Sequence, residues 1–301
     1  MRGWMSSASN SYLPPVPLGH FMRGSSVGIV LYSNSIVFST GDYVNCLPDA
    51  LGWVQYGITK DRHLIKILSH PKIPIRAWAG VLGGTGLTAY FGLKEIGKPK
   101  PGDIVVVSAA AGAVGSVVCQ LAKNVFQCKV VGIAGGERKC QWLREKLNIH
   151  EAVDYKEKKF NLKLKSAIGP NGANIVFDNV GGVVLDSMLR YLAQHARVVL
   201  CGAVSSMNDG PGPIYNSMSL IVKSASMTGF TLFDYSASYS EAFENISKCL
   251  LEGSLQYTED VIFGLENAPK ALLRLFGVDG GNFGKLIVDL HPSSSNPNSK
   301  Y

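Results

Sequence analysis

The stretch that decides the fold is Ile104–Val118, which reads IVVVSAAAGAVGSVV. It opens with a β-branched run and passes through small residues. It then continues with the apolar spacing of a helix. The small residues follow the pattern Ala110-x-Gly112-x-x-Gly115, which permits a tight turn and a close approach of the backbone to a ligand. The stretch therefore predicts a strand, a turn and a helix whose first N–H groups can receive an anion.

Outward from this turn, strands and helices alternate, which is typical of a parallel sheet with crossover helices. The expected helices cover residues 114–124, 137–147, 184–192 and 240–252. The expected strands cover residues 104–107, 129–134, 152–154, 174–178, 197–201 and 226–230. Six strands in this setting predict an α/β fold with the doubly wound parallel sheet of a Rossmann domain, in which an alanine replaces the first glycine of the phosphate turn.

A second, mostly β lobe is expected on either side of that domain. Residues 1–82 contain short strand-like runs at 26–32, 43–44 and 53–58, separated by turn residues. After residue 253 the chain has a strand near Val261, a helix over 266–276 and a closing strand over 285–290. The expected domains are therefore 1–82, 83–253 and a return segment 254–290, followed by a polar, disordered tail over 291–301.

The residues after the second strand bear on which dinucleotide binds. An NAD site has an acidic residue there, whereas this strand runs into Gly135-Gly136, with Arg138 and Lys139 just beyond. Two glycines leave room for a 2′-phosphate, and cations neutralise it, so the sequence favours NADPH over NADH. The alternative is that Arg138 and Lys139 only face solvent on a first helical turn. Tyr155, after the third strand, is a further candidate for the 2′-phosphate end.

Composition excludes several other classes of protein. The net charge of +7 is spread along the chain, which disfavours nucleic-acid binding. No apolar run is long enough to span a bilayer, and the N-terminus lacks the apolar core of a signal peptide. The six cysteines form no CxxC pair and the six histidines no HxxxH pair, so we expect no zinc or other metal site and no disulfide framework. Scattered thiols favour a reducing compartment, and we expect a cytoplasmic protein.

Eight strings in the chain, in this order, resemble one family. They are MRGWM, SYLPPVPLGHFMRG, GVLGGTGLTAYFGL, AAAGAVGSVV, FDNVGG, CGAVS, GLENAP and GGNFGK. The family is that of the zinc-independent medium-chain dehydrogenases/reductases, which includes prostaglandin reductases (leukotriene B4 12-hydroxydehydrogenases), alkenal double-bond reductases and curcumin reductase. The resemblance implies a GroES-like substrate-binding lobe beside the Rossmann domain. Members normally carry further residues before the string that matches MRGWM, so we expect an N-terminally truncated lobe.

The resemblance also implies roles for particular residues. Tyr235 would face the substrate and act in catalysis, and Tyr12 would lie in the opening loop of the substrate cleft. The other residues would contact NADPH, and they are Gly112, Ala113, Val114 and Gly115 at the pyrophosphate, Lys139 and Tyr155 at the 2′-phosphate, Asn179, Cys201, Gly202 and Ser205 along the cofactor, and Phe230 and Asn282 near the nicotinamide.

The implied reaction is reduction of the C=C bond of an α,β-unsaturated ketone or aldehyde, in the enzyme class EC 1.3.1. Charge develops on the carbonyl oxygen in such a reaction, and we expect Tyr235 to donate a hydrogen bond to it. The expected partners are a small-molecule enone or enal and a second copy of the chain in a homodimer. We expect no membrane partner. Quinone reduction on the same scaffold and a non-catalytic, truncated NADPH-binding homologue remain as alternatives. Tyr155 and Lys159 match the YxxxK pattern of short-chain dehydrogenases. In that class the pair lies on a helix far downstream of the glycine turn, whereas here it follows the third strand directly, so we interpret the match as chance.

Overall fold

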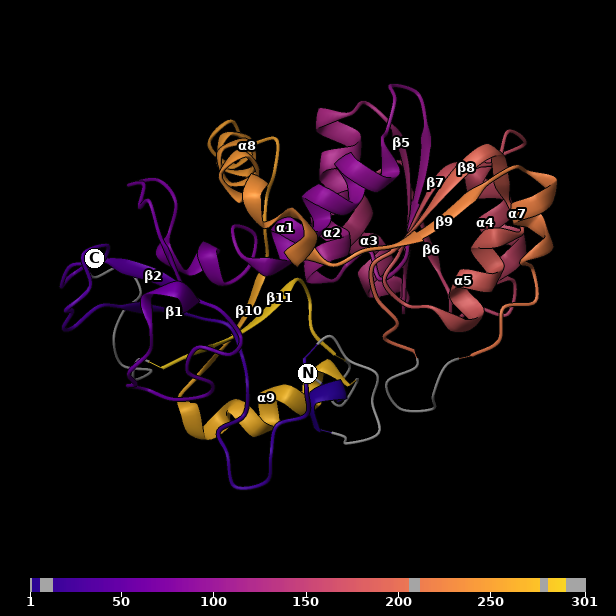
Figure 1. Cartoon of the computed structure of the whole chain (residues 1–301). Helices are drawn as coiled ribbons and strands as arrows, with labels where there is room; N and C mark the ends of the chain where they lie inside the picture. Colours follow the sequence, from indigo (N-terminus) through magenta and orange to yellow (C-terminus); the bar gives the residue numbers. More distant parts are fainter. Residues whose placement is uncertain (1, 6–12, 206–211, 277–280, 291–301) are drawn as a thin grey trace. The chain divides into compact units, whose positions relative to one another are not determined.

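The computed structural model describes residues 2–5, 13–205, 212–276 and 281–290. The chain divides into two compact units. One unit is the continuous segment Gly84–Thr258, and the other combines Met1–Gly83 with Glu259–Tyr301. Figure 1 shows both units along the course of the chain.

The continuous unit is built on a six-stranded sheet in the order β6-β5-β4-β7-β8-β9. Every neighbouring pair in it is parallel. The strands are β4 Ile104–Val107, β5 Lys129–Ala134, β6 Glu151–Asp154, β7 Ala173–Asp178, β8 Leu192–Leu200 and β9 Ser226–Gly229. This order confirms the expected Rossmann sheet, and its direction of winding reverses between β4 and β7.

Helices cover both faces of the sheet, and the alternation along β5 shows which helix lies where. Gly132 faces Leu143 of α3, whereas Val131 and Ile133 on either side of it pack with the helices of the opposite face. Those opposite helices are α4 Phe160–Ile168 and α5 Gly182–Leu189, and Figure 1 places the short α7 Met218–Val222 on the same side. The face on which Gly132 lies is covered by α2 Ala113–Gln120 and α3 Glu137–Glu145.

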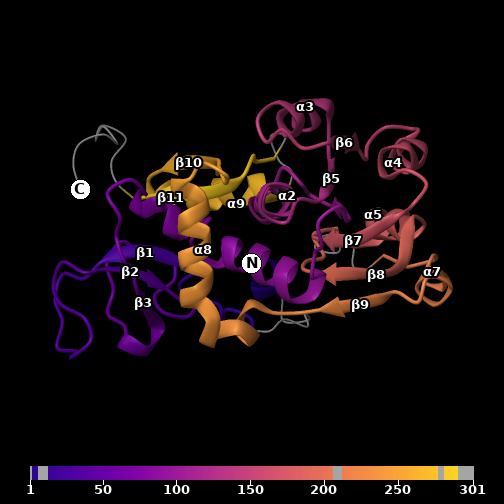
Figure 2. The same ribbon diagram turned by 90° about the horizontal axis from the view of Figure 1, so that it is seen from above.

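A further helical layer lies on the α2 side of the sheet, where α1 packs against both α2 and α8. Figure 2 shows α8 crossing over this region. The elements are α1 Gly84–Phe91, which continues as the π-helical η4 Gly92–Gly97, the 3-10 helix η6 Leu232–Ser238 and α8 Tyr239–Leu251. The helix α2 likewise continues as a π-helical turn, η5 Leu121–Val125.

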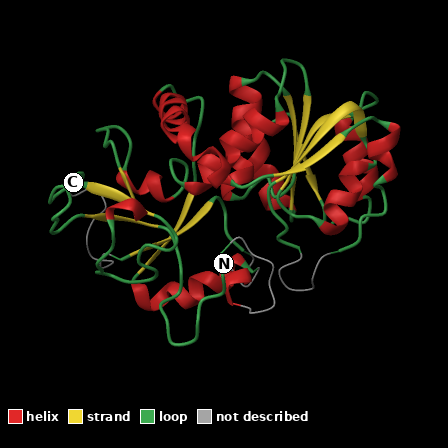
Figure 3. Ribbon diagram, in the orientation of Figure 1, coloured by secondary structure: helices red, strands yellow, loops and turns green. Residues whose placement is uncertain are grey.

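The other unit is smaller, and Figure 3 shows that loops and turns make up most of it. It has an antiparallel sheet of β1 Ser26–Ile29, β2 Tyr43–Cys46 and β3 Leu64–Lys66, and a parallel pair of β10 Glu259–Phe263 and β11 Lys285–Asp289. Its helices are η1 Arg2–Met5, η2 Asp61–His63, η3 Ile75–Ala79, η7 Leu265–Asn267 and α9 Ala268–Leu275. The side chains of Arg76 and Glu259 form an ion pair of 2.6 Å that joins its early and late segments.

The structure corrects the sequence expectations at several elements. The expected strand over 53–58 is wrong, because Gly52 takes a positive φ of 84° and the Trp53 N–H bonds to the Met22 carbonyl in a bent segment. The expected strand over 26–32 ends at Ile29, and the helix expected over 184–192 ends at Leu189. The expected disordered tail over 291–301 lies outside the described residues. In the part of the chain that the structure describes, no helix is both long and apolar enough to cross a membrane.

Candidate functional site

The glycine-rich turn between β4 and α2 is shaped by close backbone contacts. Ala109 adopts a left-handed conformation with φ of 47°, and the Gly112 N–H donates to the Ala109 carbonyl at 2.9 Å. A Cβ on Gly115 would lie 2.4 Å from the Ala109 oxygen and 2.8 Å from the Ala110 Cα. Only glycine therefore allows the first turn of α2 to lie this close to the end of the strand.

The start of α2 offers unpaired donors in front of that turn. The Ser116 N–H bonds to the Gly112 carbonyl at 3.0 Å, so the N–H groups of Ala113, Val114 and Gly115 precede the first intrahelical bond. These groups and the positive end of the helix dipole suit a pyrophosphate. The turn thus brings together the four residues expected at the pyrophosphate, which include Gly112 at the N-cap.

A buried polar network joins the ends of the two central strands, where the winding of the sheet reverses. The Ser108 hydroxyl, after β4, donates to Asp178 Oδ1 at 2.7 Å and accepts from the Asn179 N–H at 2.8 Å. The Asn179 side chain donates to the Ser108 carbonyl at 2.7 Å. Ligands of open α/β sheets bind at this reversal point. The network holds Asn179 there with its side-chain nitrogen already bonded.

Asp178 also fixes the loops that follow β7 and β8. Its carboxylate accepts from the N–H groups of Val180 and Gly181, and its carbonyl accepts from Cys201 and Gly202. Burial raises the pKa of the Asp178 carboxyl, although the bonds from Ser108, Val180 and Gly181 oppose that shift. Burial and the nearby Asp178 raise the pKa of the Cys201 thiol to about 12, so this thiol is a small, unreactive wall of the site.

Ser205 ties the loop after β8 to the loop after β7. Its hydroxyl donates to the Val180 carbonyl at 2.6 Å, and its N–H donates to the same oxygen at 3.0 Å. Gly182 has a φ of 54°, and a Cβ there would lie 2.9 Å from Ser205 Oγ. Asn179, Cys201, Gly202 and Ser205 thus lie on two loops that bond to each other at the carboxyl ends of β7 and β8.

At the end of β5, the side chains of Tyr155 and Lys156 lie over Gly135. A Cβ on Gly135 would lie 3.1 Å from the Tyr155 hydroxyl and 3.1 Å from Lys156 Cε. The buried carboxylate of Asp154 bonds to the N–H groups of both Gly136 and Lys156 at 2.9 Å, which holds the two loops together. Lys139 lies on the first turn of α3 beside them.

The charges at this end of the site repel one another. Burial, and then the charge of Lys156, lowers the pKa of Lys139 below the usual lysine value. Two ammonium groups this close favour a bound anion that would neutralise both. Sequence reasoning found Lys139 and Tyr155 but missed Lys156, because adjacency to Tyr155 along the chain gave no sign that it reaches Gly135. Arg138 is exposed on the outer side of the same helical turn.

Tyr235 lies in η6, directly after the edge strand β9. Its ring stacks on Phe91 with the ring centroids 4.8 Å apart and the planes 7° apart, and it meets Phe230 edge-on at 6.3 Å. Burial, and then the charges of Glu95 and Asp234, raises the pKa of the Tyr235 phenol. The phenol is therefore protonated at neutral pH and is a hydrogen-bond donor. Among the described residues, its hydroxyl has no hydrogen-bond partner.

The remaining expected residues are more scattered. The Phe230 ring lies against Gly92, where a Cβ would come within 2.6 Å of it, so it packs on the start of η4. Asn282 belongs to the other unit, where its side-chain amide donates to the Gly284 carbonyl at 2.8 Å. Tyr12 lies outside the described residues.

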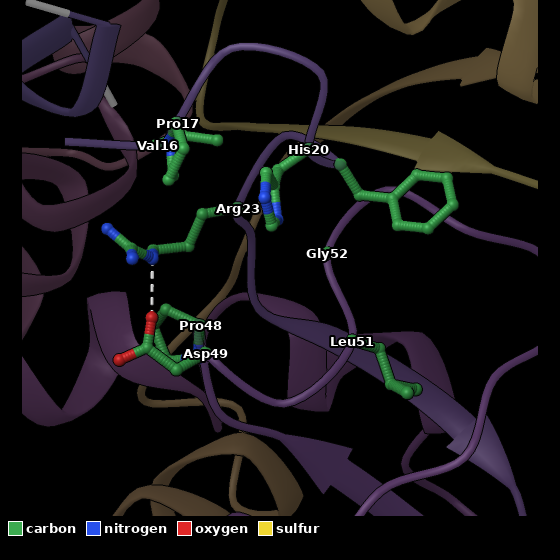
Figure 4. Close-up of a pocket in the computed structure, with 9 residues that line it drawn as sticks. Val16, Pro17, His20, Arg23, Pro48, Asp49, Leu51 and Gly52 are labelled. Carbon is green, nitrogen blue, oxygen red and sulfur yellow. Dashed lines mark ion pairs between the residues drawn. The ribbon is translucent and has the colours of Figure 1, made fainter.

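A separate cavity of about 150 Å³ lies in the other unit, and Figure 4 shows its lining. Its cation, Arg23, forms an ion pair with Asp49 and lies 5.6 Å over the ring of Trp4. The guanidinium of Arg23 therefore already interacts with protein groups. Sequence reasoning assigned no role to this cavity, and its residues do not include any of the expected site residues.

The fold and the loops at its carboxyl edge define a dinucleotide-binding oxidoreductase of the medium-chain type. Residues 113–248 match the family described as "Zinc-binding dehydrogenase", and residues 1–67 match the "N-terminal domain of oxidoreductase". The NADPH-dependent curcumin reductase of Escherichia coli is 38% identical over 296 residues, which are 96% of this chain and 83% of that protein. The NADP-dependent 2-alkenal reductase of Nicotiana tabacum is 38% identical over 96% of this chain and 82% of its own length.

Solved structures agree with the sequence relatives. The crystal structure of CurA from Vibrio vulnificus in complex with NADPH superposes with a TM-score of 0.87 at 39% identity, over 97% of this chain and 86% of that one. The chain belongs to this family of medium-chain reductases, as the resemblance implied. The chain covers 82–86% of the length of these relatives. Among the described residues, no group of three or more His, Cys, Asp or Glu side chains could hold a metal ion.

Proposed function

We propose that this protein is an NADPH-dependent reductase of the C=C bond of α,β-unsaturated ketones and aldehydes. Its relatives at 37–38% identity are named for curcumin, 2-alkenals, pulegone and prostaglandins as substrates. The observation that carries the proposal is the group of Tyr155, Lys156 and Lys139 around Gly135, at the place where a dinucleotide's adenosine ribose ends. A carboxylate there would select NADH, and the three donors present suit a 2′-phosphate instead.

The turn after β4 and the loops after β5, β7 and β8 suit the pyrophosphate and the 2′-phosphate of this cofactor. The N–H groups at the start of α2 would hold the pyrophosphate, which Gly115 lets approach closely. Tyr155, Lys156 and Lys139 would hold the 2′-phosphate. Asn179, Cys201, Gly202 and Ser205 would line the cofactor along the two bonded loops, and Phe230 would lie at its nicotinamide end. A role for Asn282 stays a prediction from the resemblance, because this residue belongs to the other unit.

NADPH, when bound, supplies a hydride to the β-carbon of the unsaturated substrate. Negative charge then develops on the substrate's carbonyl oxygen, and the protonated phenol of Tyr235 donates a hydrogen bond to that oxygen. A proton from solvent then adds to the α-carbon and completes the reduction of the C=C bond. The raised pKa of Tyr235 keeps this donor protonated through the neutral range. A Tyr235→Phe variant keeps the ring and removes only the donor. We expect its kcat on an enone to fall by about 10²-fold, because one oxyanion donor contributes roughly 2.7–4 kcal/mol or somewhat less when others share the charge.

Two measurements test the proposal in sequence. Thermal unfolding is followed with no ligand, with NADPH and with NADH, because a ligand at about a hundred times its Kd adds roughly 2.7 kcal/mol of stability. NADPH oxidation is then followed with trans-2-nonenal, 3-nonen-2-one and 1,4-benzoquinone. We expect NADPH to stabilise the protein and NADH not to, and we expect turnover of the enal and the enone. Turnover of the quinone only would favour a quinone reductase, and binding without turnover would favour a non-catalytic protein.

Two finer features belong to the same proposal. A homodimer is supported by the open edge strand β9 and by the apolar side chains of α7 beside it, where Ile221 is 72% exposed and Val222 is 66% exposed. Light scattering after size-exclusion chromatography measures the mass directly. A reducing compartment such as the cytoplasm is supported by six free cysteines, of which Cys46, Cys119, Cys128 and Cys140 are buried.

A further inference from the structure

We infer that Phe91 is a positioning residue, which holds the Tyr235 phenol in the orientation that catalysis needs; this inference rests on the proposed function. The two rings are stacked with planes 7° apart and centroids 4.8 Å apart. Phe91 itself is only 1% exposed, at the last position of α1. One face of the Tyr235 ring therefore lies on a fixed, buried surface.

The backbone of Tyr235 gives a reason why its side chain needs this support. Tyr235 interrupts η6 with non-helical angles of φ −112° and ψ 17°. The 3-10 helix on either side is short, and no side-chain hydrogen bond of the described residues holds the phenol. The orientation of the ring is thus set by aromatic contacts, with Phe91 on its face and Phe230 at its edge.

Phe91 is held in turn by the elements around it. The neighbouring Tyr90 donates its hydroxyl to Glu241 of α8 at 2.9 Å, and Lys94 of η4 pairs with the same carboxylate. The next residue, Gly92, lies so close to Phe177 and Phe230 that a Cβ would come within 2.8 Å of one and 2.6 Å of the other. The π-helical turn begins at this glycine, and such turns often occur at functional sites. The chain at Phe91 is therefore fixed on both sides.

The test is a double-mutant cycle on kcat with 3-nonen-2-one as substrate and NADPH saturating. Phe91→Leu keeps an apolar side chain of similar volume but removes the flat surface. We expect kcat to fall about three- to tenfold with a smaller change in KM, because a loosened donor is misplaced in the transition state. In a Tyr235→Phe background, the same substitution should leave kcat unchanged, because the group it positions is gone. Phe91→Tyr, which keeps the ring, should retain most of the activity.

A second readout does not depend on activity. The cofactor-free protein is labelled with 3-fluorotyrosine, and the ¹⁹F resonance of Tyr235 is the one missing from the Tyr235→Phe spectrum. In Phe91→Leu this resonance should move towards the position of an exposed tyrosine, because the ring current of Phe91 is lost. Phe160→Leu in α4, a buried phenylalanine on the far face of the sheet, is the matched control. It should lower stability without moving the resonance or kcat.

The outcomes separate the inference from the proposed function. Wild-type kcat in Tyr235→Phe would overturn the role of Tyr235 and, with it, that of Phe91. A slow Tyr235→Phe together with wild-type kcat and an unmoved resonance in Phe91→Leu would overturn the inference alone. The same fold-loss from Phe91→Leu in both backgrounds would show that Phe91 acts on the fold and not through Tyr235, which also overturns the inference.

Discussion

At the scale of single residues, Gly115 leaves the least room for a side chain at the pyrophosphate turn. In a Gly115→Ala variant the new methyl group would meet the Ala109 oxygen at 2.4 Å, so the turn or the start of α2 must shift. We expect the free energy of unfolding to fall by about 1–3 kcal/mol, as is usual for overpacking. The affinity for NADPH should fall at least about tenfold, because the shifted N–H groups no longer face the pyrophosphate. Urea unfolding and fluorescence titration measure the two quantities.

The control for this variant is Gly28→Ala in β1. A Cβ at Gly28 would meet nothing within 4 Å, so the substitution adds a methyl group without a clash. Its stability should stay within about 0.5 kcal/mol of wild type, and its NADPH affinity should be unchanged. If Gly115→Ala bound NADPH as tightly as Gly28→Ala, the turn would not be the pyrophosphate site.

Lys139 gives a prediction about pH. Its pKa is lowered in the folded state from 10.5, so between the lowered value and 10.5 the unfolded chain binds more protons, and stability rises with pH. Below that window the charged ammonium lowers the stability of the cofactor-free protein by a constant amount. Lys139→Met removes this effect. We expect its cofactor-free Tm to exceed that of wild type at pH 7, and the difference to shrink as the pH rises towards 10.5.

Lys139→Arg is the matched variant, because it keeps a positive charge beside Lys156 and should show no such gain. Saturating NADPH should reverse the order at pH 7, with wild type more stable than Lys139→Met, since the phosphate then neutralises the pair. A difference in Tm that stayed constant between pH 7 and pH 10.5 would argue against repulsion as its cause.

At the scale of elements, Ser108 links the two central strands of the sheet at their carboxyl ends. Ser108→Ala removes the hydroxyl that donates to Asp178 and accepts from the Asn179 N–H, and it leaves both buried groups short of a partner. The expected loss is about 1–3 kcal/mol in the free energy of unfolding, measured in urea. The exposed Ser240→Ala in α8 should change it by less than about 0.5 kcal/mol. Equal losses in the two variants would mean that the network contributes nothing.

The same scale shows which elements the sequence could predict. The strands at Ile104–Val107 and Lys129–Ala134 were predicted to the residue, because a buried parallel strand is an uninterrupted β-branched run with turn residues at its ends. The helix α4, Phe160–Ile168, was missed because its lysines mask an apolar face of Phe160, Leu164 and Ile168. The run over 53–58 looked like a strand, but β character alone does not provide a neighbouring strand to pair with.

At the scale of the whole molecule, the site residues divide by how they are held. Residues of the glycine turn and of the loops after β7 and β8 could be predicted, because their positions follow from the order of the strands. Lys156 and Phe91 could not, because Lys156 lies against Gly135 of another loop and Phe91 stacks on Tyr235 of another element, and the sequence does not place these segments side by side. Asn282 was expected at the cofactor, yet it belongs to a unit made of two distant segments, so that role stays a prediction.

Two kinds of charge can attract NADPH: the net charge of the whole chain, +7, and the local charge of Lys156 and Lys139. Replacement of Lys156 separates the two. A basic surface attracts any anionic dinucleotide, and salt screens that attraction over about 10 Å at 0.1 M. NADPH carries an extra phosphate, so even a general attraction makes its kcat/KM fall more steeply with salt than that of NADH. If only the general charge acted, the loss of any one lysine would change the difference between the two slopes equally. We expect this difference to depend on Lys156 and Lys139, which the extra phosphate meets directly in the proposed function. Lys156→Met should lower kcat/KM for NADPH about tenfold at low salt, leave that for NADH nearly unchanged, and reduce the difference between the two slopes.

The control is Lys270→Met in α9, which removes one exposed charge from the other unit. It lowers the net charge by the same amount as Lys156→Met, so a general effect of charge would be equal in the two variants. Steady-state kinetics between 20 mM and 500 mM NaCl compare them. If Lys270→Met reduced the NADPH slope as much as Lys156→Met, selection of NADPH would come from the surface charge as a whole. If only Lys156→Met does so, selection is local to the loops around Gly135.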